Sequence, residues 1–228
     1  MSNLKDLISQ IQTNPNALFA LIGLALLISA LVIIKKVKFS TKLITQIAIM
    51  LALGAVLKTF KIYTLPYGGS VTIGSMVPII LMALLYGPEV GFVTGFLFGI
   101  ITLILDPYIL APVQVLFDYP LAFMALGLAG YVKKSKYLNA LLCKLTKSSP
   151  STKKVETLLN VLAALVGILG RFICACISGV VFFASYAGEM NPYLYSIIYN
   201  GSYLGLDAII CIAILILLPI NQIKKAIL

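Results

Sequence analysis

Apolar segments about as long as a bilayer is thick recur along this chain, and they limit its fold more than any other feature. A helix needs about 20 apolar residues to cross the hydrocarbon core of a membrane. Because 61% of the residues are hydrophobic and only 11% are charged, the sequence predicts an all-α integral membrane protein, one helical bundle without a soluble domain. The segments expected to span the membrane are 17–34, 43–60, 71–86, 90–105, 112–132, 158–186 and 202–219.

Lysines lie mostly at the ends of these segments, and their positions predict the orientation of the bundle. The clusters at 35–42, 133–154 and 224–225 share one side of the membrane if the amino terminus is outside, and such clusters mark the cytoplasmic side. Lys58 and Lys61 fall on the other side and are exceptions. The net charge of +10 therefore reports orientation and not nucleic-acid binding. We expect a multi-pass protein of the cell membrane with an external amino terminus and a cytoplasmic carboxyl terminus.

Small residues recur at a four-residue spacing in two of the apolar segments. Gly91, Gly95 and Gly99 follow one another at this spacing, and Ala48 and Ala52 repeat it once. Small residues on one face of a membrane helix allow another helix to approach closely. The alanines therefore predict close contact with a helix of this protein or of a partner.

An acidic residue, Asp118, lies in the fifth apolar segment within the run QVLFDYP. A carboxylate at membrane depth is costly, so it normally pairs with another group or faces a cavity. If the helix begins at Pro112, Asp118 falls in its second turn, roughly 9 Å below the start. Arg171 is the natural internal partner, because a neighbouring cation would keep the carboxylate charged before a ligand binds. We therefore expect Asp118 to be a functional group.

Polar and aromatic residues gather with Asp118 at the face predicted to be external. Many come from loops expected at 63–75, 106–112 and 188–201. One carboxylate among rings, with amides to orient the ligand, suits a small, cationic, partly aromatic organic molecule. For any single tyrosine, the alternative is an interfacial aromatic belt. The candidates are Gln114, Asp118, Tyr119, Tyr186, Tyr193, Tyr195, Tyr199 and Asn200.

Catalysis and resident metal ions are not expected. The sequence contains no histidine and no GxSxG motif, and it has no paired carboxylates within one helical turn. Its cysteines form no CxxC pair and lie mostly in apolar runs, which indicates structural thiols. It also lacks a GxxxxGK[ST] phosphate loop, so any ATP must be hydrolysed by another protein. We therefore predict a non-enzymatic protein without metal or cofactor.

Several stretches of the chain are similar to a known family. They are LITQIAIMLALGAVL, PYGGSVTIGSMVPI, DPYILAPVQVLFDYPLAFMALGLAG, GRFICACISGVVFFASYA and YLYSIIYNGSY. In these stretches the chain resembles the thiamine-specific substrate-binding (S) subunit of energy-coupling factor (ECF) transporters, the thiamine transporter family. The resemblance implies a high-affinity thiamine-binding subunit that takes up the vitamin with a transmembrane coupling protein and two cytoplasmic ATPases. It also implies a six-helix vitamin-binding membrane domain at 41–228 and an amino-terminal extension at 1–40 with one transmembrane helix.

The resemblance also implies roles for individual residues. Asp118 takes the place of the acidic residue that engages the ligand, and Phe183 falls where some members carry a stacking tryptophan. Ala48 and Ala52 match the small-residue motif that contacts the coupling protein. The residues matching an aromatic or hydrogen-bonding role are Tyr119, Tyr195 and Asn200.

One position, Ala175, departs from the family pattern, because members tend to carry a histidine there. The loss of a ring removes stacking area and leaves three alternatives. Thiamine is held more weakly, Tyr63 or Tyr67 replaces the ring, or the ligand is a related pyrimidine or thiazole compound. A further alternative is an autonomous proton- or ion-coupled carrier with Asp118 as its coupling site.

Overall fold

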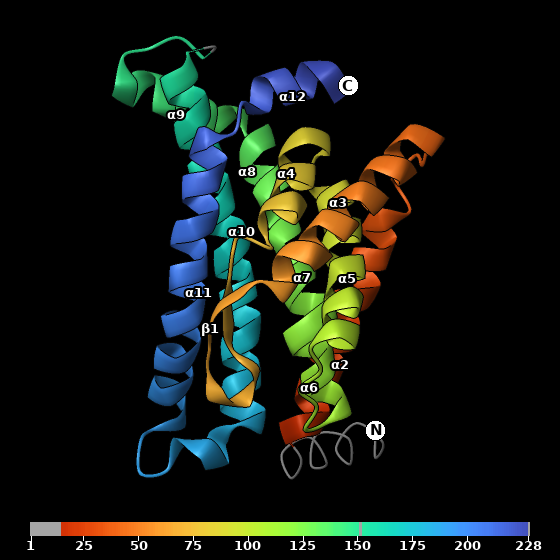
Figure 1. The fold of residues 1–228 in the computed structure, drawn as a ribbon, viewed down its shortest axis with the longest axis vertical. Helices are drawn as coiled ribbons and strands as arrows, with labels where there is room; N and C mark the ends of the chain where they lie inside the picture. The colour runs from red at the N-terminus through yellow and green to blue at the C-terminus, as the bar shows by residue number, and fades with distance from the viewer. Residues whose placement is uncertain (1–14, 151, 228) are drawn as a thin grey trace, which may run out of the picture.

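The computed structural model describes residues 15–150 and 152–227, and most of them are helical (Figure 1). The long helices run side by side along the long axis of the molecule, and a small β-hairpin lies among them. The hairpin consists of β1 (Lys61–Thr64) and β2 (Ser70–Thr72). The helices are α2 (Pro15–Ile34), α3 (Thr41–Thr59), α4 (Val77–Tyr86), α5 (Pro88–Leu105), α6 (Pro112–Leu116), α7 (Ala122–Met124), α8 (Ala129–Lys134), α9 (Lys136–Thr146), α10 (Lys153–Phe182), α11 (Pro192–Leu217) and α12 (Ile220–Ile227).

Five helices in the described ranges are long and apolar enough to cross a membrane. They are α3, α5, the broken helix Pro112–Lys134, α10 and α11. Two further apolar segments, Leu21–Ile34 in α2 and Val77–Tyr86 in α4, are shorter. The prediction of an all-α membrane protein is therefore confirmed. The predicted count of seven spans depends on the two shorter segments and is not confirmed.

Helix α4 forms the centre of the bundle, and α5 packs against the broken helix through its glycines. Ile79 and Ile80 of α4 are completely buried. A Cβ atom on Gly99 would lie 2.5 Å from the carbonyl oxygen of Tyr119, so this crossing requires glycine. The close helix contact predicted from the spacing of the α5 glycines is therefore present. It also sets the position of the turn that carries Asp118.

The fifth apolar segment is a broken helix instead of the regular helix we expected. A π-helical turn, Phe117–Leu121, follows α6 and contains Pro120, which has no backbone N–H to donate. Short α7, a 3₁₀ turn and α8 then complete the span. Asp118 lies in the π turn, a type of irregularity that is frequent at functional sites.

The hairpin replaces the predicted start of the third helix at residue 71. Lys61 is paired with Thr72, and Thr64 with Ser70, so residues 70–72 form a strand and α4 begins only at Val77. The tight turn holds Tyr67 at φ 65°, a left-handed conformation that is strained for a residue with a large side chain. The hairpin therefore presents Tyr67 in a defined orientation.

Two other predicted loops are partly helical. The lysine-rich link contains α9, which begins after Ser135, whose hydroxyl accepts a hydrogen bond from the Leu138 N–H at 3.3 Å. The expected loop at 188–201 is short, because Asn191 caps α11 and Pro192 occupies its first position. Residues from Tyr193 to Asn200 therefore lie on a rigid helix.

Candidate ligand-binding site

A cavity opens between the hairpin, the π turn and the helices α5, α7, α10 and α11. Counting the solvent in its open mouth, the recess contains about 800 Å³. Among the predicted candidates, Tyr186 and Tyr193 do not line it, and Tyr193 is 66% exposed. The predicted residues that line the cavity are Gln114, Asp118, Tyr119, Arg171, Phe183, Tyr195, Tyr199 and Asn200.

Gln114 holds the carboxylate of Asp118 in place. Its side-chain nitrogen donates to Asp118 Oδ2 at 2.5 Å and to the carbonyl oxygen of Tyr108 at 3.0 Å. Its side-chain oxygen accepts from the N–H of Leu110 at 3.0 Å. The Gln114 side chain is 1% exposed, so these contacts fix its amide. Gln114 therefore connects Asp118 rigidly to the loop between α5 and α6.

The other acidic groups around the cavity are already paired with cations. The Asp106 carboxylate lies 2.7 Å from Lys61 Nζ and 3.6 Å from Lys58 Nζ. Arg171 Nη1 lies 3.8 Å from Asp207 Oδ2. No cation lies within 4 Å of the Asp118 carboxylate in the described part of the chain. Asp118 is therefore the cavity carboxylate that forms no ion pair among the described residues.

The expected ion pair between Arg171 and Asp118 is not formed, because Arg171 pairs with Asp207 of α11. Asp207 is 1% exposed and also accepts from the N–H and hydroxyl of Thr72, at 3.1 and 3.0 Å. The Arg171 guanidinium lies 4.1 Å from the centre of the Phe123 ring, a cation–π contact. This network connects α10, α11 and β2 beneath the cavity. Asp207 was missed, although it is a carboxylate inside the apolar segment 202–219 and the argument applied to Asp118 holds for it too.

Asp106 connects the hairpin to the loop after α5 at the mouth of the cavity. Burial raises the pKa of Asp106, but the hydrogen bond from Lys61 and the charge of Lys58 together lower it further, so the pKa lies below its usual value. Lys58 Nζ also donates to Ser70 Oγ of β2 at 2.9 Å. The sequence interpretation of Lys58 and Lys61 as orientation exceptions missed this tether.

Aromatic rings cover the cavity in two groups. At the mouth, Tyr67 packs on Tyr186 with 4.4 Å between ring centres, and Tyr108 stacks on Phe183 at 5.9 Å. On α11, Tyr199 stacks on Tyr195 and meets Tyr203 edge-on, both at 5.9 Å. Tyr108 and Tyr203 were not among the predicted candidates. The four-residue spacing on α11 would have grouped Tyr203 with Tyr195 and Tyr199 if the helix start had been placed correctly.

Several polar groups at the cavity hold its walls together. The Tyr119 hydroxyl accepts from the Tyr108 N–H at 2.6 Å and donates to the Asp106 carbonyl at 3.0 Å. The Tyr199 hydroxyl accepts from the Gly69 N–H at 3.0 Å and thereby ties the hairpin to α11. The Asn200 amide nitrogen donates to the Ala175 carbonyl at 3.3 Å. The hydroxyls of Tyr119 and Tyr199 and the amide of Asn200 therefore serve first to position other groups.

Ala175 lines the cavity on α10, at the position where a ring was expected from the family resemblance. Of the two tyrosines proposed to replace that ring, Tyr67 lines the cavity, whereas Tyr63 does not and is 57% exposed. The geometry therefore favours Tyr67 as the source of additional stacking area.

Ala48 and Ala52 lie away from the cavity on an exposed face of α3. The large apolar residues Ile44, Ile49 and Leu53 are also exposed, with 55%, 58% and 47% of their surfaces accessible. This face is therefore available to lipid or to another membrane helix.

The fold and the cavity define a class of protein: an integral membrane helical bundle with a polar, ring-lined recess for a small molecule. Residues 44–227 match the family model described as "Thiamine transporter protein (Thia_YuaJ)". The chain belongs to this thiamine transporter family, which is a family of transporters and not of enzymes.

Individual relatives agree with this assignment. The chain is 35% identical over 178 residues to the thiamine transporter ThiT of Bacillus subtilis, which covers 76% of this chain and 88% of that protein. It is 30% identical over 132 residues to ThiT of Lacticaseibacillus paracasei, covering 55% and 61%. The solved structure of ThiT from Listeria monocytogenes has the same fold, with a TM-score of 0.66 at 22% identity over 81% of this chain and 96% of that one.

Proposed function

We propose that the chain is a membrane-embedded, high-affinity subunit that binds thiamine and mediates its uptake. The names of the relatives support thiamine as the ligand. The observation that carries the proposal is the Asp118 carboxylate, which forms no ion pair with any described residue and lies in a ring-lined cavity. Thiamine carries a positive thiazolium ring and a pyrimidine ring, so a single counter-charge and stacking surfaces are the chemistry that it needs. Asp118 acts here as a counter-charge and not as a catalyst.

Each predicted binding residue has a distinct proposed task. Asp118, oriented by Gln114, offsets the positive charge of the ligand. Phe183 and Tyr195 supply ring surfaces, while Tyr119 and Asn200 border the pocket and hold its walls. Arg171 supports the site indirectly through Asp207.

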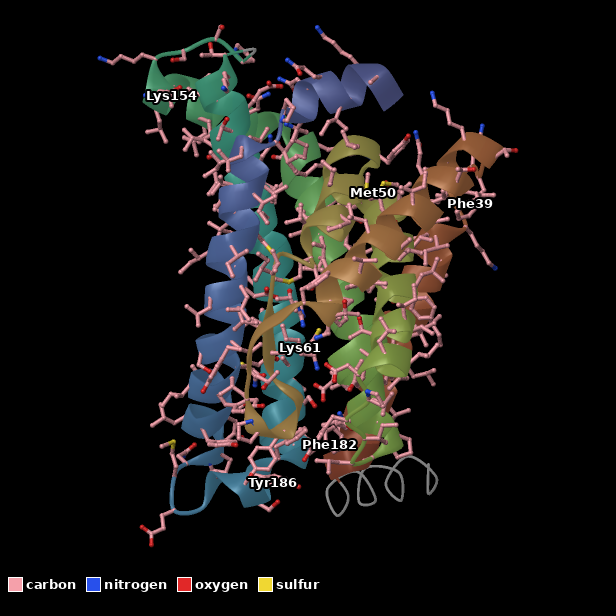
Figure 2. The ribbon with its side chains drawn as sticks, viewed as in Figure 1. Phe39, Met50, Lys61, Lys154, Phe182 and Tyr186 are labelled. Carbon is pink, nitrogen blue, oxygen red and sulfur yellow. The ribbon has the colours of Figure 1, made fainter. Side chains whose placement is uncertain are left out.

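The proposed orientation has the cavity mouth outside and the lysine-rich end in the cytoplasm. In support of it, Figure 2 shows Tyr186, which packs on the mouth residue Tyr67, at the end of the molecule opposite Lys154. Helix α2 begins at the Tyr186 end and α12 lies at the lysine-rich end. The first fourteen residues of the predicted external amino terminus lie outside the described residues. We place the protein in the cell membrane on these grounds.

We further propose that uptake requires a transmembrane coupling protein and two cytoplasmic ATPases. The exposed face of α3 that contains Ala48 and Ala52 suits close contact with a partner helix. The family match begins at residue 44, which supports the division into an extension at 1–40 and a vitamin-binding domain at 41–228.

Equilibrium binding to the purified full chain tests the proposal. Thiamine and its separate pyrimidine and thiazole halves are titrated against wild type, Asp118→Asn and Glu89→Gln. Glu89 is the matched control because it is an acidic residue paired with Lys134, far from the cavity lining. We expect tight thiamine binding by wild type and Glu89→Gln, and a loss of at least tenfold in Asp118→Asn.

The contrary outcomes are distinct. If the folded wild-type protein binds none of these compounds, the thiamine assignment is wrong. If Asp118→Asn binds as tightly as wild type, the counter-charge role is wrong. Thiamine uptake into vesicles that contain this chain alone would favour the autonomous carrier over the ATP-driven assembly.

A further inference from the structure

A second recess, separate from the cavity, lies at the lysine-rich end of the bundle. This groove runs between the first turns of α10 and the junction of α11 with α12 and contains about 810 Å³ counting its open side. Lys153 lines it, and Figure 2 shows the adjacent Lys154 at the end opposite Tyr186. The groove and the cavity share no lining residue. The groove is therefore separate from the cavity.

Two residues that carry hydrogen-bond donors, Lys153 and Asn160, line the groove. Asn160 is only 7% exposed, and its side-chain oxygen accepts from Lys133 Nζ at 2.8 Å. Its side-chain nitrogen makes no hydrogen bond within the described residues, and the residue itself lines the groove. Lys153 is exposed and makes no ion pair in the same part of the chain. The acidic residue of the groove, Glu156, already accepts a hydrogen bond from Asn221. Lys153 and the Asn160 amide thus offer donors suited to phosphate oxygens, beside the Glu156 carboxylate.

The rim of the groove is apolar. Ile216 and Leu217, at the end of the membrane-spanning α11, line it with 47% and 82% of their surfaces exposed. A polar interior directly beside exposed aliphatic side chains matches the two parts of a phospholipid, a polar headgroup and acyl chains. A free anion would make no favourable contact with these aliphatic side chains.

Helix α9, which packs on α10, indicates that this level of the molecule meets the membrane boundary. Tyr137, Leu141 and Leu145 form an exposed apolar stripe at four-residue spacing, with exposed fractions of 77%, 39% and 70%. Leu142, on another face, is buried in the core. A helix with such a stripe at the end of a bundle lies in the headgroup region. The groove is therefore at the depth of lipid headgroups.

The excess of lysines at this end of the bundle favours anionic lipids over neutral ones. The clusters at 133–154 and 224–225 supply many lysines around the groove, whereas the acidic residues at this end are Glu89 and Glu156. We propose that the groove binds the phosphate of an anionic phospholipid from the adjacent leaflet, through Lys153 and the Asn160 side-chain nitrogen, with its acyl chains against Ile216 and Leu217. Basic residues beside a membrane segment attract anionic headgroups in this way.

The test measures lipid retained by the purified full chain after exchange into nanodiscs of equal parts phosphatidylglycerol and phosphatidylcholine. Native mass spectrometry counts each lipid on wild type, Lys153→Gln, Asn160→Leu and the control Lys154→Gln. Lys154 is the matched control because it is the next lysine on α10 and does not line the groove. Circular dichroism and monodisperse elution show that each variant is folded.

We expect wild type to retain phosphatidylglycerol in preference to phosphatidylcholine, and Lys153→Gln and Asn160→Leu to lose this preference by about fivefold. Lys154→Gln should lose less than twofold. If Lys153→Gln and Lys154→Gln lose the preference for phosphatidylglycerol equally, the groove is not a specific site and the lysines attract anionic lipid diffusely. Equal retention of both lipids would overturn the anionic preference, and displacement of the lipid by equimolar inorganic phosphate would identify a free-anion site instead.

Discussion

The buried ion pair between Arg171 and Asp207 offers the sharpest test of the structure. The two side chains are 10% and 2% exposed and 3.8 Å apart. Two unit charges at that distance attract by about 4 kcal/mol at an effective dielectric constant of about 20. Removing one member of such a pair leaves a buried charge uncompensated and costs roughly 3–5 kcal/mol. Arg171→Met should therefore lower the unfolding midpoint in detergent by roughly 6–20 °C.

A double-mutant cycle isolates the pair. In an Asp207→Asn background, Arg171→Met leaves no orphaned carboxylate, so its further cost should fall by about 2–3 kcal/mol. The matched cycle uses Asp118→Asn, and we expect a coupling to Arg171 of less than about 1 kcal/mol. Thermal or denaturant unfolding followed by circular dichroism measures both. A coupling of Arg171 to Asp118 as large as that to Asp207 would refute the assignment of Asp118 as the unpaired carboxylate of the cavity.

Three further predictions concern the cavity. Gly99→Ala should weaken thiamine binding at least tenfold by titration calorimetry, because its Cβ would press on the Tyr119 carbonyl beside Asp118; unchanged affinity would contradict the tight crossing. Tyr67→Ala should weaken binding about fivefold if its ring stacks on the ligand, whereas Tyr67→Phe should not. The ion pairs of Asp106 with Lys58 and Lys61 should persist at pH 5 and be lost only below about pH 4, since the carboxylate is charged above its lowered pKa. Faster protease cleavage of the hairpin would report their loss. Asp106→Asn should show this faster cleavage already at neutral pH.

The sequence predicted which segments are long helices, but it predicted the positions of their ends less well. The apolar runs identified the long helices because burial in lipid requires continuous apolar length. The start of α11 was misplaced, although Asn191 and Pro192 are a recognisable capping signal, because the tyrosine-rich segment resembled a loop. Residues 71–72 were assigned to a helix because a short run has no period that separates strand from helix.

The residues of the candidate site were also only partly predictable from the sequence. Asp118 stood out because a carboxylate inside an apolar segment is conspicuous, and Gln114 lies four residues earlier, within reach on the same face. Asp207 is also a carboxylate inside an apolar segment, so the same argument should have singled it out. Which of the two acids pairs with Arg171 depends on how α10, α11 and β2 meet, and no local pattern encodes this.

By itself, the sequence determined that the chain is a membrane-embedded helical bundle, and it singled out Asp118 as an acidic group within an apolar segment. Continuous apolar length and the cost of a charge in lipid are local properties that can be read residue by residue. Only the tertiary structure decided which ion pairs form. Arg171 pairs with Asp207, and Lys58 and Lys61 pair with Asp106, whereas Asp118 forms no ion pair among the described residues. Pairing is a competition among distant groups for a few cations, so its outcome exists only once the helices and the hairpin are packed together.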